Sequence, residues 1–540
     1  MNMKYTLASG IVAMGLLAGC GAAPIDLDPI TNTGQRDLNK QEFTEEQYKD
    51  WGHADLFTDT IPGMSVMKAY REILASREGK KVIVGVVDSG VDINHEDLKN
   101  VIWVNEDEIP NNNIDDDNNG YVDDIHGWNF LGTAVHENLE MTRIVKRGDD
   151  GSEMYKAAKA QYDKEFNETE NTLNRYAEMM AITDLTDSIV RKELGKDAYT
   201  LEELRSIDAQ DEQMMQTKRF LEFYMSQYGS VEEFKDLLEK DMEILTSQYE
   251  YHLNPDFDGR SEVGDDPYDI NDTNYGNNDV ITDLERTRHG THVAGIIAAQ
   301  RDNNIGMNGV ATNVEIMALR AVPDGDEYDK DIALAIRYAV DNGAKVINGS
   351  FGKSFSPNKE WVYDALKYAA KHDVLFVHAA GNDGSFLDEV ENYPNDQENN
   401  GPEFVDNVLT VGALNWAYGE QMIAGFSNYG KINVDVFAPG TKIYATTPDD
   451  TYEYLQGTSM AAPGVAGVAA LIRSYFPKLK ASQVKAIIME SGLTSDQEVI
   501  VAGDPNNKQK FSELSRSGNM VNLYNALIMA DKVSRKKIKL

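Results

Sequence analysis

Three short segments carry residue types that together could support nucleophilic catalysis. Asp88 ends an apolar run, His289 begins a segment of small residues, and Ser459 lies within Gly-Thr-Ser-Met-Ala-Ala-Pro. A serine hydroxyl is a weak nucleophile until an imidazole accepts its proton, and a carboxylate on the other ring nitrogen holds the imidazole in one tautomer. We therefore interpret Ser459 as the candidate nucleophile, His289 as its general base and Asp88 as the orienting carboxylate.

Such residues need a rigid frame, and the sequence predicts one. Continuous β-branched runs, which are typical of strands buried on both faces, alternate with helical patterns such as those at residues 331–342 and 359–372. Alternation of strand, helix and strand predicts a mostly parallel sheet between two layers of helices, a three-layer α/β/α fold. The predicted strands are residues 81–88, 314–319, 345–348, 374–378, 408–411 and 434–437.

The three segments closely resemble the signature segments of the subtilase family of serine peptidases, in the family's chain order of Asp, His and Ser. The resemblance covers residues 81–107 and 289–532. It implies the subtilisin-like fold, with Asp88, His289 and Ser459 as the catalytic residues. It also implies hydrolysis of peptide bonds through an acyl-enzyme on the serine.

The same resemblance assigns roles outside the three segments. The stretch at residues 379–383 is similar to the family segment whose asparagine donates to the oxyanion, so Asn382 is implied to share that role with the backbone N–H of Ser459. Gly349 stands where relatives commonly have a bulkier residue. The resemblance therefore does not predict the shape of the specificity pocket. Residues implied to line this pocket and bind the substrate are Ser350, Phe351, Gly352 and Gly381.

His289 and His292 also allow a second interpretation, as zinc ligands of a metallohydrolase. Such a site needs a third ligand and normally a glutamate base, as in His-Glu-x-x-His. The sequence contains no such pattern, and His292 belongs to the segment that resembles the subtilase signature. We therefore favour the serine mechanism.

Closely spaced aspartates predict structural calcium sites. Residues 115–124 have oxygen-bearing side chains at alternate positions and a glycine at the sixth, as in the early half of an EF-hand loop. The glutamate of the twelfth position is missing, and a solvated acidic turn is the alternative. By similarity to subtilisins, Asp97 and Asn303 are implied to share a second calcium. The ligands predicted for the first site are Asp115, Asp117, Asn119, the carbonyl of Tyr121, and Asp123 or Asp124.

The composition limits the partners of the chain. The 540 residues include 51 Lys and Arg against 90 Asp and Glu, a net charge of −39. Because such a surface repels nucleic acid, we expect no nucleic-acid partner. The resemblance to the subtilase family implies protein or peptide substrates, and we expect a monomer. The expected division is a signal peptide at residues 1–19, a tether at 20–50, a catalytic domain at 51–130 and 255–540, and a mainly helical insertion at 131–254.

Residues 151–250 differ from the rest, with no proline, three glycines, 23 acidic and 12 basic residues, and apolar side chains at helical spacing. We interpret them as amphipathic helices inserted between the catalytic Asp and His. Too few residues precede the first core strand to form an independent prodomain. One hypothesis is therefore that these helices restrain the enzyme by overhanging its cleft. The alternative is a solvated outgrowth remote from the cleft.

The single cysteine, Cys20, excludes an intrachain disulfide and has a telling position. It follows a short apolar run that ends in Leu-Ala-Gly-Cys, which resembles the bacterial lipobox. This predicts an exported protein that is lipid-anchored through Cys20 to the cell envelope, at the outer membrane, facing either side. A plain signal peptide with an incidental cysteine is the alternative.

Together these features predict a serine endopeptidase of the bacterial cell envelope. The main alternative is a catalytically idle, calcium-stabilised surface module that only binds partners. Labelling of Ser459 by a fluorophosphonate probe would distinguish the enzyme from the binding module.

Overall fold

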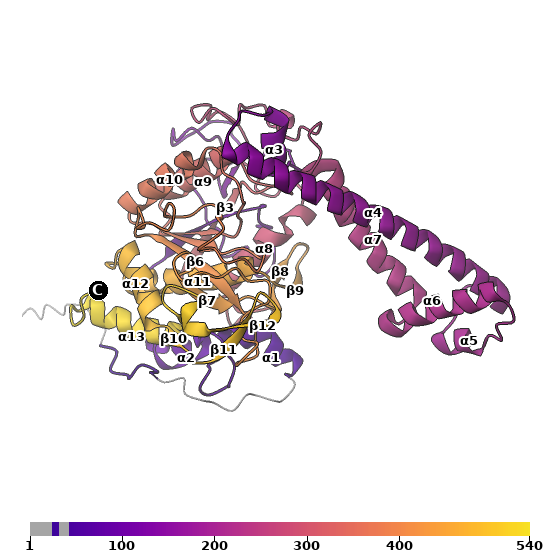
Figure 1. Ribbon diagram of the computed structural model, residues 1–540. Coiled ribbons are helices and arrows are strands. Elements are labelled where there is room, and N and C mark those ends of the chain that lie inside the picture. The colour runs from indigo at the N-terminus through magenta and orange to yellow at the C-terminus, as the bar shows by residue number, and fades with distance from the viewer. Residues whose placement is uncertain (1–23, 32–42) are drawn as a thin grey trace, which may run out of the picture.

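The computed structural model describes residues 24–31 and 43–540 (Figure 1). The lipobox sequence at Cys20 lies outside these ranges, so the predicted anchor is not tested by the structure. Within them, a compact α/β body carries a long helical arm, which Figure 1 shows projecting from one side.

The body is organised around a large, mostly parallel sheet, which confirms the predicted fold class. All neighbouring strands run parallel except β10 and β13, which pair antiparallel at one edge. In the part of the chain that the structure describes, the nine strands lie in the order β10 (Leu493–Thr494), β13 (Asn519–Met520), β7 (Val436–Pro439), β6 (Val408–Leu414), β5 (Leu375–Ala379), β4 (Val346–Gly349), β1 (Val82–Asp88), β3 (Val314–Arg320) and β2 (Gly127–Asn129).

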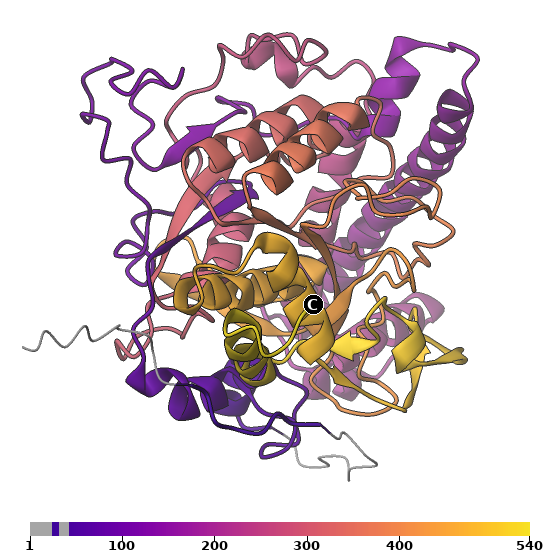
Figure 2. The ribbon, with the colours of Figure 1, turned by 90° about the vertical axis from the view of Figure 1, so that its left-hand side faces the viewer.

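Helices cover both faces of this sheet (Figure 2). One face holds α9 (Asp329–Asp341) and α10 (Lys359–Lys371). The other packs against α8 (Arg288–Ala298) and the central helix α11 (Thr458–Tyr475), with α2 (Val66–Glu72), α12 (Ala481–Ser491) and α13 (Leu523–Ser534) around them.

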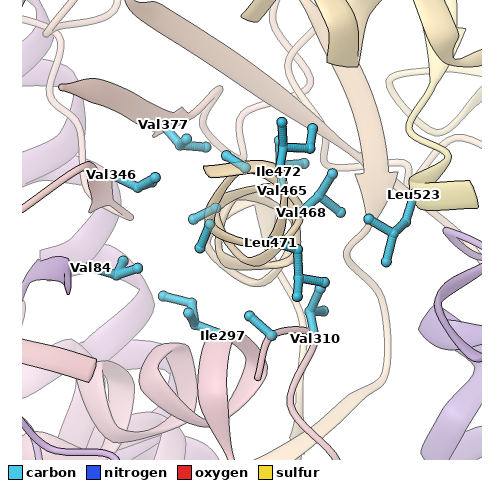
Figure 3. Close-up of a cluster of buried hydrophobic side chains, with 14 of the residues drawn as sticks. Val84, Ile297, Val310, Val346, Val377, Val465, Val468, Leu471, Ile472 and Leu523 are labelled. Carbon is cyan, nitrogen blue, oxygen red and sulfur yellow. The ribbon is translucent and has the colours of Figure 1, made fainter. Parts of the chain in front are cut away.

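Strand β1 shows how the sequence produces these layers. Successive side chains of a strand point to opposite faces. Val84 and Val86 join the cluster around α11, whereas Ile83 and Val87 join the cluster under α9. Figure 3 shows the first cluster, in which valines of three strands surround α11 together with Ile297 of α8. Burial on both faces explains why the run is continuously apolar.

Because the central strands are parallel, their carboxyl ends meet at one edge of the sheet. Asp88 ends β1, Gly349 ends β4 and Ala379 ends β5. The three neighbouring strands therefore deliver the segments that carry the predicted site to the same place.

The arm consists of helices between β2 and α8. It contains α3 (Glu140–Arg147), the 42-residue α4 (Glu153–Leu194), α5 (Leu201–Ser206), α6 (Glu212–Tyr228) and α7 (Val231–Ser247), and it returns through a π-helical turn at Gln248–His252. Helix α4 is about 63 Å long at 1.5 Å per residue. Figure 1 shows α4 and α7 running away from the body side by side, with α5 and α6 at the tip. Only the base of the arm can therefore border the body.

Smaller elements complete the fold. Hairpins form from β8 (Ile443–Thr447) with β9 (Thr451–Leu455) and from β11 (Glu498–Val501) with β12 (Asp504–Lys510). Helix α2 is followed by a 3-10 turn at Leu74–Ser76. A short helix α1 (Glu45–Asp50) precedes it, and further 3-10 turns lie at Trp51–His53, Arg260–Glu262, Glu285–Thr287 and Phe511–Glu513. Among the described residues, no helix combines the length and apolar character needed to cross a membrane.

Candidate active site

Asp88 and His289 form a close pair at the carboxyl edge of the sheet. Asp88 Oδ1 lies 2.7 Å from His289 Nδ1 and also accepts from the N–H of Ser89 at 2.8 Å. The carboxylate belongs to a residue that is 1% exposed, whereas the imidazole is 40% exposed. The aspartate thus fixes Nδ1 as the protonated nitrogen and leaves Nε2 directed elsewhere, as a general base requires.

This contact depends on a close approach between helix α8 and strand β1. A Cβ at Gly290 would lie 2.0 Å from Gly90 O and 3.1 Å from Asp88 Cβ. Any side chain at this position would push the helix away from the strand. The glycine next to His289 is therefore needed to bring the imidazole to its carboxylate.

The environment of His289 changes its basicity. Burial lowers the pKa of the imidazole, but the charge of Asp88 and the hydrogen bond to it outweigh that effect, so the pKa is raised above 6.5. A base with a raised pKa accepts the serine proton more readily, provided that it is neutral at the working pH.

Ser459 lies in the first turn of α11, which begins at Thr458. Its hydroxyl is half-buried and donates to Ser350 O at 3.2 Å, while the Ser350 hydroxyl donates to Ser459 O at 2.9 Å. These reciprocal bonds tie the start of α11 to the end of β4. Among the residues that the structure describes, the Ser459 hydroxyl forms no hydrogen bond with His289. Contacts between nucleophile and base often tighten only when a substrate binds.

Asn382 is oriented by the residue before the nucleophile. Its Oδ1 accepts from the N–H of Thr458 at 2.8 Å and from the Thr458 hydroxyl at 3.1 Å. With the oxygen held in this way, the amide nitrogen has no hydrogen-bond partner among residues 24–31 and 43–540 and is available to donate. That is the requirement for a donor to a developing oxyanion at Ser459.

His292 has a structural role that the zinc interpretation does not fit. It is fully buried, and its Nε2 donates to the carbonyl oxygens of Ile443 and Glu453, at 3.1 and 3.2 Å. Burial lowers its pKa to about 3, so the ring is neutral and holds the β8–β9 hairpin against α8. The two histidines thus direct nitrogens to different partners, Asp88 and the hairpin.

The segment predicted to bind the substrate borders this site. Ser350 is bonded to Ser459 as described, and Phe351 O accepts from His378 Nε2 at 2.8 Å. Gly352 is exposed. Gly381 contacts the nucleophile's helix, because its N–H donates to the Thr458 hydroxyl at 3.0 Å.

The unusual Gly349 has a steric explanation. A Cβ at this position would lie 2.6 Å from Phe376 Cζ and 3.0 Å from Phe351 Cε1. The two phenyl rings occupy the space that a larger residue would fill, which sequence comparison alone could not reveal.

The acidic loop at residues 115–124 folds into a cluster of oxygens. Carboxylate oxygens of Glu108, Asp115 and Asp117 lie within 4.8 Å of one another. The N–H of Asn119 donates to both Asp115 and Asp117, and its side-chain nitrogen donates to Asp117 and Asp124. The predicted ligands Asp115, Asp117 and Asn119 are therefore brought together.

The carboxylate of Asp123, another predicted ligand, is directed to other partners. The carboxylate of Asp123 accepts from the N–H groups of Asn112 and Asn113, at 3.1 and 2.8 Å. The N–H of Tyr121 donates to Asn119 Oδ1 at 2.8 Å. Asp124 is also committed, since it accepts from Asn105, Asn119 and Tyr338, and burial raises its pKa to about 6.

Glu108 is the residue that sequence reasoning missed. It is 5% exposed, its Oε1 accepts from the N–H groups of Asp116 and Asp117, and its Oε2 accepts from Asp123 N–H. Its carboxylate comes from upstream of the loop rather than from the twelfth position. No local pattern identifies it, because the EF-hand template searches only downstream.

Asp97 and Asn303 also lie together. The amide of Asn303 donates to Asp97 Oδ1 at 2.6 Å, and Met307 N–H donates to the other oxygen at 3.3 Å. Burial raises the pKa of Asp97. Within the described residues, only the group around Glu108 has three acidic or histidine ligands close enough to share an ion.

The geometry defines a class of protein. It is an α/β protein whose parallel sheet presents, at one edge, a hydrogen-bonded Asp–His pair, a serine at a helix start and an asparagine with a free donor. Nucleophilic acyl transfer is the chemistry that this arrangement can perform.

Comparison with known families identifies the group within that class. The model of the subtilase family, peptidase S8, matches residues 79–519. The chain therefore belongs to the subtilase family, and the resemblance inferred from the three segments is confirmed.

Individual relatives match shorter parts. Over 224 residues the chain is 40% identical to a thermophilic serine proteinase of Bacillus sp. (strain AK1), which covers 41% of this chain and 49% of the relative. It is 40% identical over 199 residues to subtilisin DY of Bacillus licheniformis, covering 36% and 67%. The solved structure of the prenylagaramide maturation protease PagA is 29% identical, covers 45% and 82%, and has a TM-score of 0.36. The chain thus spans about half the length of the thermophilic proteinase.

Proposed function

We propose that this protein is a serine endopeptidase that hydrolyses peptide bonds of proteins or peptides through an acyl-enzyme on Ser459. The observation that carries the proposal is the 2.7 Å contact between Asp88 and His289 at the edge where α11 presents the serine. Membership of the subtilase family supports it.

The residues account for each step of the reaction. Ser459 Oγ attacks the carbonyl carbon while His289 Nε2 accepts the hydroxyl proton, and Asp88 stabilises the imidazolium. The oxyanion accepts from Asn382 Nδ2 and the N–H of Ser459. When the C–N bond breaks, the proton on His289 passes to the leaving amine. A water molecule then attacks the acyl-enzyme while His289 accepts its proton, and this proton passes to Ser459 Oγ as the acid is released.

A fluorophosphonate probe tests the proposal directly. We expect the probe to label the wild-type protein at Ser459 and not to label Ser459→Ala or His289→Ala, because only an activated serine reacts. A folded wild-type protein that resists labelling would instead support the idle binding module.

We further propose that the protein is exported and lipid-anchored to the cell envelope through Cys20. The support is the lipobox-like sequence that ends at the only cysteine. Cys20→Ser should move the protein from the membrane fraction to the soluble fraction, since several acyl chains anchor firmly. Membrane association of this variant equal to that of the wild type would refute the anchor.

We also propose that calcium stiffens the body at the loop around Glu108. Three carboxylates within 4.8 Å of one another fit a hard cation with oxygen ligands. Glu108, Asp115 and Asp117 would hold the ion, with Asn119 in support. Bound calcium would neutralise their mutual repulsion and have no part in the chemistry. A second ion near Asp97 and Asn303 is proposed on the family resemblance alone.

A further inference from the structure

A groove of about 900 Å³ lies between the base of the arm and the body. Its body wall includes Arg286 and Asp324, and its arm wall is formed by α4, α7 and the π-helical turn. This size is within the ~300–1,000 Å³ of sites that hold small ligands, so there is room for a few side chains but not for a folded domain. We call it the arm groove.

The arm groove lies close to the catalytic pair. Arg286 lies three residues before His289 in the chain. Asp324 lies two residues after Val322, and the N–H of Val322 donates to Asp88 O at 3.2 Å. A chain advances at most ~3.6 Å per residue, so the body wall is within about 11 Å of the backbone at both catalytic positions. A peptide held at Ser459 could therefore extend into the groove.

Polar contacts fix the arm wall in place at Asp324. This carboxylate contacts His136 Nδ1 at 2.8 Å and His252 Nε2 at 3.1 Å, and it accepts from the Ser247 hydroxyl at 3.1 Å. The hydrogen bond from His252 is the main reason that the pKa of Asp324 lies well below its usual range. Arg286 lies 3.7 Å from the same carboxylate. Arg286, the cation of the body wall, is thus already paired with Asp324.

A buried ion-pair network holds the root of the arm. Glu140 of α3 pairs with Arg143 at 2.6 Å and with Lys353 of the body at 3.1 Å, and all three side chains are at most 3% exposed. Removing one member of such a network leaves an uncompensated buried charge. The arm base is therefore a built part of the body's surface rather than a loosely attached segment.

The arm wall combines apolar and acidic side chains. Met180, Met242 and Ile244 line it, and Ile244 is 58% exposed. Glu239, Glu243 and Glu250 also line it, and none of them forms an ion pair with any residue that the structure describes. Methionine side chains adapt to partners of different shape. Unpaired carboxylates beside exposed apolar groups fit a partner that is both cationic and apolar.

We propose that the arm groove binds a cationic, apolar segment of an extended polypeptide substrate, next to the bond that is cut. The inference rests on the proposed peptidase function and deepens it. Acidic residues of the arm attract lysine or arginine side chains of the substrate, while the methionines and Ile244 receive its apolar side chains. The groove thereby favours unfolded, basic chains over short or acidic peptides.

A pair of extended peptides tests this. Both contain one cleavage core and carry extensions of equal length on each side, either Lys and Leu residues or Glu and Leu residues. We expect a higher kcat/KM for the basic peptide. In Glu239→Lys/Glu243→Lys the basic-to-acidic ratio should fall about tenfold or more, through KM, and added salt should reduce the wild-type preference. Ile244→Ser should weaken the binding of both peptides.

A matched control changes the same charge outside the groove. Glu178 and Glu193 of α4 are exposed and do not line the groove, so Glu178→Lys/Glu193→Lys should leave the ratio within about twofold of wild type. An equal loss in this control would show that only the net charge of the arm matters and would overturn the groove. So would an unchanged ratio in Glu239→Lys/Glu243→Lys.

Binding to Ser459→Ala separates this inference from the proposed function. Fluorescence anisotropy of the labelled basic peptide needs no turnover. Binding that is lost in Glu239→Lys/Glu243→Lys supports the groove even if no peptide is cut, whereas failure of the unextended core peptide to be cut refutes the peptidase. Absence of preferential binding of the basic peptide would refute the groove, even with full activity on the core peptide.

Discussion

The body and the arm are stabilised in different ways. The body buries strands on both faces and surrounds α11 with valine and alanine side chains from the sheet and α8. The arm has its own small core at the tip, separate from that of the body, formed by Val190, Leu204, Ile207, Leu221, Met225 and Val231. The candidate catalytic residues Asp88, His289 and Ser459 all lie in the body. Because the two cores are separate, we expect that the tip can be altered without changing the chemistry of the body.

The tip of the arm also has its own network of polar contacts. Asp187 of α4 accepts from Arg191, from Lys235 of α7 and from the hydroxyl of Tyr199. Burial raises the pKa of this carboxyl, but the bonds from these donors outweigh burial and lower it. The tip therefore satisfies its buried charge without help from the body.

The largest effect on turnover is expected from the nucleophile. Ser459→Ala should lower kcat for a small peptide ester by about 10⁶, and His289→Ala should match it, because the residues act as a unit. Circular dichroism should show an unchanged fold. Residual kcat above about a hundredth of wild type would place the chemistry elsewhere.

A smaller loss is expected at the oxyanion donor. Asn382→Ala should lower kcat about 10²–10³-fold with little change in KM, because the bond forms only in the transition state. The control is Asn506→Ala, which removes an exposed asparagine of the β11–β12 hairpin. Equal activity of the two variants would mean that Asn382 is only a turn residue.

The pH profile should report the Asp88–His289 contact. Because the pKa of His289 is raised, the acid limb of kcat/KM should have its midpoint above pH 6.5 and fall about tenfold per unit below it. Only neutral imidazole is a base. A midpoint below 6.5 would contradict the contact.

The same contact should make the folded protein less stable as the pH rises, whereas kcat/KM increases with pH. The raised pKa means that the folded state binds the proton more tightly. The pair therefore stabilises the fold fully below pH 6.5, and this contribution is lost as the pH rises through the folded-state value. Urea titrations at several pH values would measure it.

Calcium removal should affect stability more than chemistry. An ion that binds only the folded protein stabilises it by mass action, so a chelator should lower Tm by about 3 °C or more, and Asp117→Ala should abolish the difference. Ester turnover at low temperature should hardly change. Identical calorimetric scans with and without chelator would show that the loop around Glu108 is solvated surface.

The smallest effect on turnover is expected from the arm's tip. Leu204→Ala opens a cavity at a fully buried position and should destabilise the tip by about 2–5 kcal/mol, measurable by hydrogen exchange. Turnover of a small ester should stay within about twofold of wild type. A large loss would show that the tip and the active site are coupled.

Local patterns predicted what local chemistry determines. The apolar run ending at Asp88 and the small-residue segments at His289 and Ser459 predicted the first core strand, the pairing of Asp88 with His289 and the family. Helical spacing in residues 151–250 identified the arm's helices but not their direction. A periodic pattern gives a buried face without saying what lies against it.

Contacts between distant segments were not predictable in the same way. The Asp324 carboxylate joins His136 and His252, which belong to separate parts of the chain. Each is an ordinary polar residue by itself. Their pairing depends on how the arm returns to the body, which no window of sequence records.

The order of the catalytic residues along the chain has a consequence for the timing of activity. Asp88 and His289 are 201 positions apart, and Ser459 meets Ser350 across a further separation of 109. Chains emerge from the N-terminus and fold domain by domain as they do so. Strand β1 and helix α8 are therefore synthesised long before α11, the helix that presents Ser459. The growing chain can therefore cleave neither other proteins nor itself until α11 has been synthesised and folded.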